Sequence, residues 1–278
     1  MQYDPSREAL YHPELKPVFV DVGHAPPFRA NNFGFSPINA WWLSNAAHLA
    51  YCDVGPIKRE LRRAELQFVN FFSQKSTQAF LATSDSFAIL AFRGTECDKL
   101  ADLIVDADIR LTPFRNGAKV HQGFLEALNQ VWDEVDEKLK EITVPIWYTG
   151  HSLGAALATL AAAHKQPAAL FTYGSPRVGN AEFVRLLDGV PVQRIVNCCD
   201  MAATVPPRIG YRHVGELDFI TPTGELLTNP SSSRVFWAKV AGRTRYAATL
   251  PWFRRDVVWA RSFADHAIVN YTAAFNRS

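Results

Sequence analysis

Regular hydrophobic spacing begins only after about residue 35 of the chain. Residues 1–35 contain five prolines and form a proline-rich N-terminal arm. Downstream, apolar residues recur at helical spacing, which predicts helices over Asn39–Tyr51 and Ile57–Leu66. The period then shortens to runs separated by polar turns, which predicts three successive strands: Phe68–Phe72, Gln78–Thr83 and Ser86–Phe92.

In the second half of the chain, predicted strands alternate with predicted helices. The pattern begins with an amphipathic helix over Phe124–Ile142. The elements expected after it are a strand over Val144–Tyr148, a helix over Leu153–His164, strands over Ala169–Thr172 and Val192–Val196 with a helix over Ala181–Leu187 between them, a hairpin from Arg212–Ile220 through Thr223-Gly224, and a final helix over Ala267–Phe275. This alternation predicts an α/β fold, with a mostly parallel sheet covered by helices on both faces. We expect one such domain over residues 1–278.

The composition fits a globular protein with a sizeable core. Hydrophobic residues make up 48% of the chain, and the net charge of +2 does not suggest binding to nucleic acid or to an acidic partner. No apolar run approaches the ~18 residues needed to cross a bilayer. Met1–Pro17 lacks the basic and apolar segments of a signal peptide. We therefore expect no transmembrane segment and a soluble, cytoplasmic protein.

The motifs of metal and nucleotide enzymes are missing from the sequence. There is no H-E-x-x-H motif and no phosphate-binding loop. The cysteines have neither the paired spacing of a zinc site nor that of a disulfide framework; they are Cys52, Cys97, Cys198 and Cys199. We expect isolated, mostly buried thiols, and no metal or organic cofactor.

A motif at residues 148–154, Tyr-Thr-Gly-His-Ser-Leu-Gly, carries the strongest chemical signal. Gly150, Ser152 and Gly154 satisfy G-x-S-x-G between a predicted strand and a predicted helix, as a nucleophile elbow requires. Glycine is needed at 150 and 154 because neighbouring backbone passes close to such a turn. The turn lifts the hydroxyl clear of the sheet and aims helix N–H groups at a developing oxyanion. Ser152 is the expected nucleophile, and the alternative is a serine that only caps the helix.

A serine hydroxyl needs a base, which in α/β-hydrolases follows both the serine and the acid along the chain. The histidines beyond Ser152 are His164, His213 and His266. His164 lies three turns into a predicted helix and should point away from the site. His213 lies within the alternating segment Tyr211–Phe219, where we expect a packed strand histidine. His266 lies in a loop before the final helix, so we expect it to be the base rather than part of a helix cap.

The acid that orients the imidazole is expected just beyond the carboxyl end of a buried strand, where catalytic groups of open α/β sheets collect. Asp200 has this position after Val192–Val196. Asp188 lies at the opposite end of that strand, Asp218 lies in the hairpin, and Asp265 adjoins the base, where neighbouring side chains diverge. We expect Asp200 to be the acid; the alternative is a turn aspartate bonded to its own backbone.

Seven ordered segments from about Asn39 to the C-terminus resemble the class 3 lipases, the family of the fungal triacylglycerol lipases. The matching segments are Phe92-Arg93-Gly94-Thr95, Val120-His121-Gln122-Gly123-Phe124, Gly150–Gly154, Phe171–Asn180, Arg194–Asp200 with Val205-Pro206, His213–Glu216, and Asp265-His266. The resemblance implies an α/β-hydrolase fold and an acyl-ester lipid substrate.

The resemblance also implies features that the residues alone do not give. It implies an oxyanion hole formed by the backbone N–H groups of Thr95 and Leu153, whereas the motif by itself indicates only Leu153. It implies a lid over residues 95–110, where this sequence lacks the tryptophan often found in the family. Secreted members of the family often carry a leader and disulfides, and this sequence shows neither.

We expect a serine carboxylic-ester hydrolase, in particular a lipase that cleaves acylglycerols through an acyl-enzyme on Ser152. A phospholipase A, a monoacylglycerol lipase, or a feruloyl-type or short-chain esterase would use the same site. A catalytically silent lipid-binding module on the same fold is the alternative of a different class. The intact set of Ser152, Asp200 and His266 argues against it.

Residues 231–261 look like a cap insertion relative to compact members of that family. Between 231 and 260 there are six basic residues and one acidic residue, a net charge of +5, so the rest of the +2 chain carries −3. Aromatic residues interleave with the cations; they are Phe236, Trp237, Tyr246, Trp252, Phe253 and Trp259. Such a mixture suits peripheral contact with a lipid interface, although an ordinary cap with a solvated basic face is the simpler interpretation.

Overall fold

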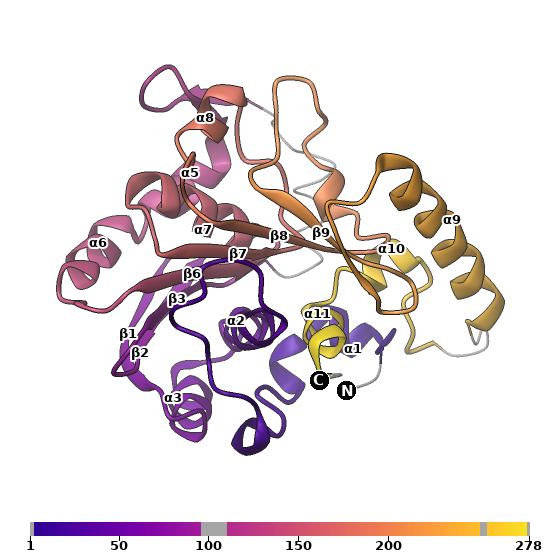
Figure 1. The fold of residues 1–278 in the computed structure, drawn as a ribbon, viewed down its shortest axis with the longest axis horizontal. Coiled ribbons are helices and arrows are strands. Elements are labelled where there is room, and N and C mark those ends of the chain that lie inside the picture. Colours follow the sequence, from indigo (N-terminus) through magenta and orange to yellow (C-terminus); the bar gives the residue numbers. More distant parts are fainter. Residues whose placement is uncertain (1–2, 96–109, 251–254, 277–278) are drawn as a thin grey trace.

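An eight-stranded sheet runs through the centre of the molecule, in a computed structural model that describes residues 3–95, 110–250 and 255–276 (Figure 1). The strands lie in the order β1-β2-β3-β6-β7-β8-β9-β10. Their bounds are β1 Gln67–Gln74, β2 Thr77–Thr83, β3 Ala88–Phe92, β6 Ile146–His151, β7 Ala169–Tyr173, β8 Val192–Asn197, β9 Glu216–Ile220 and β10 Leu226–Thr228. The strands from β3 to β9 run parallel, and the two edges are antiparallel.

Helices cover both faces of the sheet, and each layer encloses one part of the core. One face carries α2 (Pro37–Leu49), α3 (Val54–Arg63) and α11 (Ile268–Phe275), and the other carries α5 (Gln122–Asn129), α6 (Trp132–Lys140), α7 (Leu153–His164) and α8 (Ala181–Arg185). Buried side chains fill the space between the sheet and each layer. The expected α/β architecture is confirmed. A small second sheet pairs β4 (Leu111–Pro113) with β5 (Lys119–His121).

The predicted elements agree with the structure except for one long helix. The segment Phe124–Ile142 is not continuous: α5 ends at Asn129 and α6 begins at Trp132. At the break, the hydroxyl of Thr77 on β2 donates to the Ala127 carbonyl at 2.9 Å, and the Val131 N–H turns to Leu128 instead. The Ala127 carbonyl, which a continuous helix would offer to the Val131 N–H, is instead shared by the Thr77 hydroxyl and the Gln130 N–H. The hydrophobic pattern of Phe124–Ile142 gives no sign of this contact with β2, so the break could not be predicted from it.

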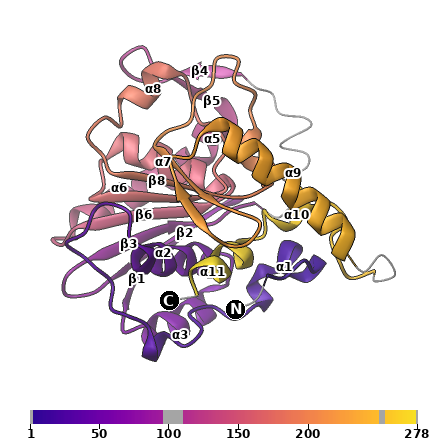
Figure 2. The ribbon, with the colours of Figure 1, turned by 45° about the vertical axis from the view of Figure 1, so that its right-hand side comes forward.

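The proline-rich arm and the insertion both contain helices. The arm carries α1 (Arg7–Tyr11) and two short 3-10 turns, Pro13–Leu15 and Val22–His24, and its Phe19 is fully buried. The insertion forms α9 (Ser232–Thr249), a long helix at the sheet edge beyond β10, followed by α10 (Arg261–Ala264) (Figures 1 and 2). Among the described residues, none of the helices combines the length and the apolar character needed to cross a bilayer.

One carboxyl group is buried within the sheet itself. Asp218 on β9 is fully buried, and burial raises its pKa from 3.8 to about 6, although the nearby Thr228 and the charge of Arg194 act to lower it. Between these two pKa values the folded protein keeps a proton that the unfolded chain releases. Stability contributed by this group therefore falls as the pH rises through about 4 to 6.

We predict that Asp218→Asn gains stability relative to the wild type as the pH rises. Asparagine has nearly the same shape and never ionises, so the variant escapes the cost that the buried carboxylate imposes. The relative gain in the free energy of unfolding between pH 4 and pH 7 should reach up to about 3 kcal/mol. Urea denaturation at the two pH values measures it. A stability difference that stays constant with pH would contradict the prediction.

Candidate active site

The G-x-S-x-G motif forms a sharp turn between β6 and α7. Strand β6 ends at His151 and α7 begins at Leu153, so that only Ser152 separates them. Its backbone has φ 58° and ψ −126°, a left-handed conformation that side chains rarely adopt. The Ser152 N–H donates to the Tyr173 carbonyl at 3.0 Å, which holds the turn against the next strand. The strained elbow expected from the sequence is present.

The two motif glycines are fixed by close backbone contacts. A Cβ added at Gly150 would lie 2.3 Å from the Gly154 carbonyl oxygen, and one added at Gly154 would lie 2.3 Å from the Phe92 carbonyl oxygen. Contacts this short cannot be relieved by turning a side chain, because the opposing atoms belong to the backbone. The motif therefore requires glycine at both positions for packing, whatever the chemistry at Ser152.

The three residues that the sequence indicates for the triad lie in hydrogen-bonding contact. The His266 Nε2 lies 3.0 Å from the Ser152 Oγ, and its Nδ1 lies 2.9 and 3.0 Å from the two carboxylate oxygens of Asp200. All three residues are fully buried. They come from the elbow after β6, the loop after β8 and the loop before α11, which meet at the carboxyl edge of the parallel strands.

Two further groups donate hydrogen bonds to the Asp200 carboxylate, and Gly174 packs against it. The Ala202 N–H donates to Oδ1 at 2.8 Å, and the Tyr271 hydroxyl of α11 donates to Oδ2. Gly174 has φ +57°, and a Cβ there would lie 2.5 Å from Oδ2. Burial by itself raises the pKa of Asp200, but His266 and the Tyr271 hydroxyl outweigh it, so the pKa is lowered and the carboxylate is charged.

A second histidine supports the backbone of His266. His151 of the motif is buried, and its Nε2 lies 2.7 Å from the His266 carbonyl oxygen while its Nδ1 lies 2.8 Å from the Tyr51 hydroxyl. Burial, and then the neighbouring His266, lower the pKa of His151 well below 6.5, so its ring is neutral. Because a carbonyl oxygen only accepts, the proton is on Nε2, and Nδ1 accepts from Tyr51.

The sequence analysis missed both Tyr271 and His151 as supports of the site. Tyr271 stands 71 residues from Asp200 in the chain, and His151 lies 115 residues from His266. Nothing in the local pattern distinguishes Tyr271 from an ordinary core residue of the last helix. His151 belongs to the G-x-S-x-G motif, but the sequence does not show that its side chain contacts the His266 carbonyl.

The other histidine candidates lie in different surroundings. His164 at the end of α7 packs against the rings of Phe114 and Trp132. His213 lies in the loop before β9, not within a strand, and its Nε2 contacts the Ala203 carbonyl at 3.0 Å. Neither has a contact with Ser152 among the described hydrogen bonds.

The alternative acids also lie elsewhere. Asp188 is exposed in the turn after α8, and Asp218 is buried in β9. Asp265 points away from the imidazole of its neighbour: its carboxylate accepts from the Cys199 N–H, the Arg261 Nε and the Tyr3 hydroxyl.

The two expected oxyanion donors lie on either side of the elbow. Leu153 is the first residue of α7, where backbone N–H groups have no partner within the helix. Thr95 follows β3, and it lines a small cavity together with Tyr51 and His151. Residues 96–109, which hold most of the expected lid, lie outside the described residues.

Comparison with known proteins places this geometry in a family. A sequence model described as Lipase (class 3) matches residues 89–210. The mono- and diacylglycerol lipase LIP4 of Malassezia restricta, a secreted protein by its name, is 30% identical over 239 residues, which cover 76% of this chain and 76% of that protein. The chain belongs to the class 3 lipase family.

Further relatives of this chain include fungal lipases. The lipase of Rhizopus niveus is 34% identical over 167 residues, and the aligned part covers 53% of this chain but only 42% of that protein. The solved structure of lipase II from Rhizopus niveus superposes with a TM-score of 0.58 and 28% identity, covering 68% of this chain and 83% of that one. The α/β-hydrolase fold expected from the resemblance is thereby confirmed.

We predict that Tyr271→Phe lowers the reactivity of Ser152 in this class 3 lipase. The variant loses a hydrogen bond to a charged carboxylate, worth about 1.5–3 kcal/mol, so the rate of labelling by a fluorophosphonate should fall roughly tenfold or more. The pKa of Asp200 should rise toward its ordinary value, which moves the acidic loss of labelling to higher pH.

The matched control for this prediction is Tyr173→Phe. Tyr173 is equally buried, but its hydroxyl donates to the Ala40 carbonyl, away from Asp200. Equal labelling rates and equal pH profiles in the two variants would show that the hydroxyl of Tyr271 does not tune the acid.

Proposed function

We propose that this chain is a serine carboxylic-ester hydrolase, with Ser152 as nucleophile, His266 as base and Asp200 as acid. The observation that carries the proposal is the continuous hydrogen-bonded line from the Ser152 Oγ through both ring nitrogens of His266 to the Asp200 carboxylate. An acylglycerol is the substrate class we propose, because the relatives compared above are named as lipases.

The reaction begins when the Ser152 hydroxyl attacks the ester carbonyl while the His266 Nε2 takes its proton. Asp200 accepts from the Nδ1–H, which fixes the tautomer and stabilises the imidazolium. The backbone N–H groups of Leu153 and Thr95 donate to the tetrahedral oxyanion; the loss of one such donor costs about 3 kcal/mol. His266 then protonates the leaving alcohol, and a water molecule activated by the same ring releases the acid.

Substrate comparison separates the proposal from its alternatives. A phospholipase A, a monoacylglycerol lipase and a feruloyl-type or short-chain esterase would share the triad and differ only in the preferred ester. Rates on triacyl-, diacyl- and monoacylglycerols, on phospholipids and on aryl esters of increasing acyl length rank these activities directly. A lipid-binding module would bind the same molecules without turnover.

We predict that Ser152→Ala abolishes both ester hydrolysis and labelling by a fluorophosphonate. Removal of the nucleophile of a triad lowers the rate by a factor on the order of a million. The control is Ser86→Ala, an exposed serine in the turn before β3, which should leave the rate within about twofold. Hydrolysis that survives in Ser152→Ala, or labelling of a different residue, would refute the assignment of the nucleophile.

We propose further that α9 is the surface that contacts a lipid interface. Phe236 and Trp237 are 58% and 66% exposed, and Val240, one turn further on, is 37% exposed. By helical geometry, the same outward side continues through Thr244 and Ala247. Gly242 and Tyr246 lie on the buried side. The helix lies on the outside of the molecule (Figure 2), and it presents bulky apolar side chains to solvent between Phe236 and Val240.

Exposed basic residues accompany the apolar stripe and match an anionic surface. By the same helical spacing, Arg243 lies at one edge of the stripe, and Arg245 is exposed nearer to the buried side. Helix α9 contains no acidic residue. Each cation near an anionic bilayer contributes about 1 kcal/mol, and the aromatic side chains add apolar burial. The combination fits shallow, peripheral binding.

We predict that Arg243→Glu/Arg245→Glu weakens binding to vesicles of phosphatidylcholine with about a third phosphatidylserine by roughly tenfold or more. Phe236→Ala/Trp237→Ala should weaken binding to neutral and anionic vesicles alike. The control is Arg59→Glu/Arg62→Glu on α3, an equal charge reversal on a distant helix (Figure 1). Co-sedimentation measures all three. Unchanged binding in the α9 variants, or an equal loss in the α3 variant, would end the proposal.

A further inference from the structure

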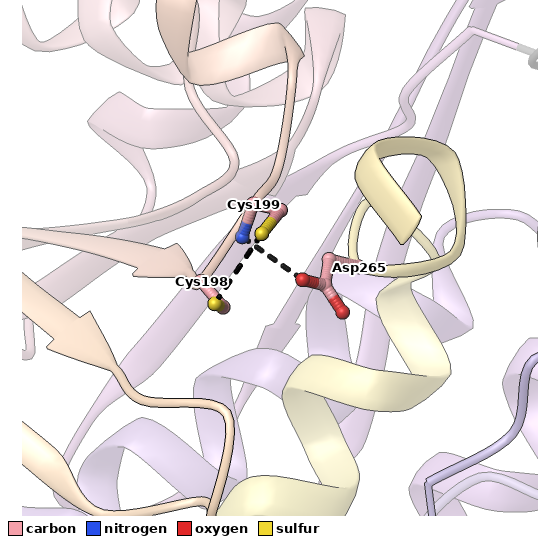
Figure 3. Close-up of side chains that lie close together, drawn as sticks. All are labelled: Cys198, Cys199 and Asp265. Atoms are coloured by element: carbon pink, nitrogen blue, oxygen red, sulfur yellow. Dashed lines mark hydrogen bonds between the residues drawn. The ribbon is translucent and has the colours of Figure 1, made fainter. Parts of the chain in front are cut away.

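Two adjacent cysteines lie at the end of β8, next to the proposed acid. Cys198 and Cys199 are 0% and 2% exposed, and their sulfur atoms are 3.5 Å apart (Figure 3). Cys198 has φ 21°, so the chain turns sharply at this point. The thiols are buried, as expected from the sequence, but these two are in mutual contact rather than isolated. Neither has a role in the reaction described above.

Helix α9 lies directly over the two sulfur atoms. The Cys198 Sγ lies 3.7 Å from the Ala238 carbonyl oxygen, and the Cys199 Sγ lies 3.5 Å from that of Lys239. A Cβ at Gly242 would lie 2.8 Å from the Cys198 Sγ. Both thiols therefore act as weak donors to a helix that packs closely against them.

The cysteine backbone also joins the loop of the acid to the loop of the base. The Cys199 N–H donates to the Asp265 carboxylate at 2.9 Å, and the Asn197 side chain donates to the Asp265 carbonyl at 3.0 Å. Asp200 and His266 are the next residues of these two loops. A change of shape at the cysteines is thus transmitted to both partners of Ser152.

We propose that Cys198 and Cys199 form a site of reversible oxidation, at which a hydroperoxide converts the two thiols into a vicinal disulfide and thereby slows turnover at Ser152. Formation of the disulfide is independent of the proposed function, and only its effect on rate rests on ester hydrolysis.

The surroundings of the two thiols shift their pKa values in opposite directions. The hydrogen bond with Cys198 lowers the pKa of the Cys199 thiol, and the positive charges of Arg261 and Arg243 lower it further. Burial and the negative charge of Asp265 act in the opposite direction but do not outweigh them. The same contact, together with burial, raises the pKa of Cys198. Cys199, whose thiolate the two cations favour, is the expected nucleophile, and the product is the same disulfide if Cys198 attacks first.

The oxidation balances with hydrogen peroxide as the oxidant. The Cys199 thiolate attacks one peroxide oxygen and the O–O bond breaks, giving a sulfenic acid and a hydroxide that takes up a proton. The Cys198 sulfur then attacks the Cys199 sulfur, the S–O bond breaks, and water leaves with the Cys198 proton. Two thiols lose two electrons and two protons in all, and one peroxide becomes two water molecules.

A cavity beside α9 brings a small oxidant close to this region, although neither cysteine lines it. It has a volume of about 540 Å³, and its lining includes Asn197 and Arg261, which both hydrogen-bond to Asp265, and Tyr246 of α9. Hydrogen peroxide is little larger than water and fits easily into a space of this size.

The reverse reaction is favoured by covalent geometry. Adjacent Cα atoms are only about 3.8 Å apart across a trans peptide, whereas bridged cysteines usually have Cα atoms about 4.4–6.8 Å apart. A disulfide between neighbours is strained for this reason, and strained disulfides are the readily reduced ones.

A metal ion fits the cluster less well. The Asp265 carboxylate already accepts from Tyr3, Cys199 and Arg261, so a cation would have to displace these donors. The Arg261 guanidinium forms an ion pair with Asp265 at 2.9 Å and would repel a cation placed between the sulfur atoms and the carboxylate. Oxidation needs neither displacement.

Oxidation should affect the triad through the backbone. Closing the S–S bond brings the sulfur atoms from 3.5 Å to about 2 Å and removes both S–H donors to α9. The peptide between Cys198 and Cys199 must turn, and the Cys199 N–H turns with it. A displacement of about 1 Å at a reacting group can cost on the order of a hundredfold in rate. We expect turnover to fall between roughly tenfold and a hundredfold.

The test uses the full chain carrying Cys52→Ser and Cys97→Ser, in which only the adjacent pair remains. The protein is treated with hydrogen peroxide and digested, and the mass of the peptide that contains residues 198–199 is measured by mass spectrometry. A loss of two hydrogens that a reductant restores supports the proposal. Oxidation of Cys199 to the sulfinic acid without the disulfide, or two unmodified thiols in protein whose methionines are oxidised, overturns it.

Rates are measured on the same samples with a soluble short-chain ester, each relative to its own untreated rate. The slowing should parallel disulfide formation, reverse with the reductant, and be absent in Cys198→Ser, where no disulfide can form. A disulfide that forms without change in rate overturns the effect on turnover. An untreated protein that hydrolyses no ester instead refutes the proposed function, and the mass measurement still decides on the disulfide.

Discussion

The close approach of three backbone segments at the elbow is the constraint on which the rest of the site depends. Strand β6 enters beneath α7 with only the hydrogen atoms of Gly150 and Gly154 between them, and Gly154 in turn faces the Phe92 carbonyl of β3. This packing forces Ser152 into a left-handed conformation at the sheet edge. The loops that carry the acid and the base need only reach that edge to meet the hydroxyl.

Much of the fold follows from local pattern. Strands β6 and β7 are short and largely apolar runs, and α7 is rich in alanine, so their types and their order along the chain could be predicted. The triad could be predicted because chemistry restricts the candidates: the elbow identifies Ser152, and few histidines and aspartates follow it at the correct end of a strand.

What could not be predicted depends on contacts between distant parts of the chain. The break between α5 and α6 originates in a hydroxyl on β2, and the Asp200 carboxylate is completed by Tyr271 on the last helix. Helix α9 shows the other difficulty, since its exposed apolar side weakens the amphipathic signal from which helices are identified. Apolar residues that face solvent on α9 occupy positions where an ordinary amphipathic helix would have polar residues, so the helical pattern is obscured.

The contacts of Asp265 have a consequence for how the molecule assembles. Tyr3, near the start of the chain, donates to the carboxylate of the residue before His266, 262 positions away. Asp4 is likewise bonded to Asn270. Contacts of such long sequence separation require the closure of a long loop and tend to form slowly. We therefore expect His266 to reach its final place late in folding, after the sheet and the elbow have formed, so that a partly folded chain would contain the serine without its histidine partner.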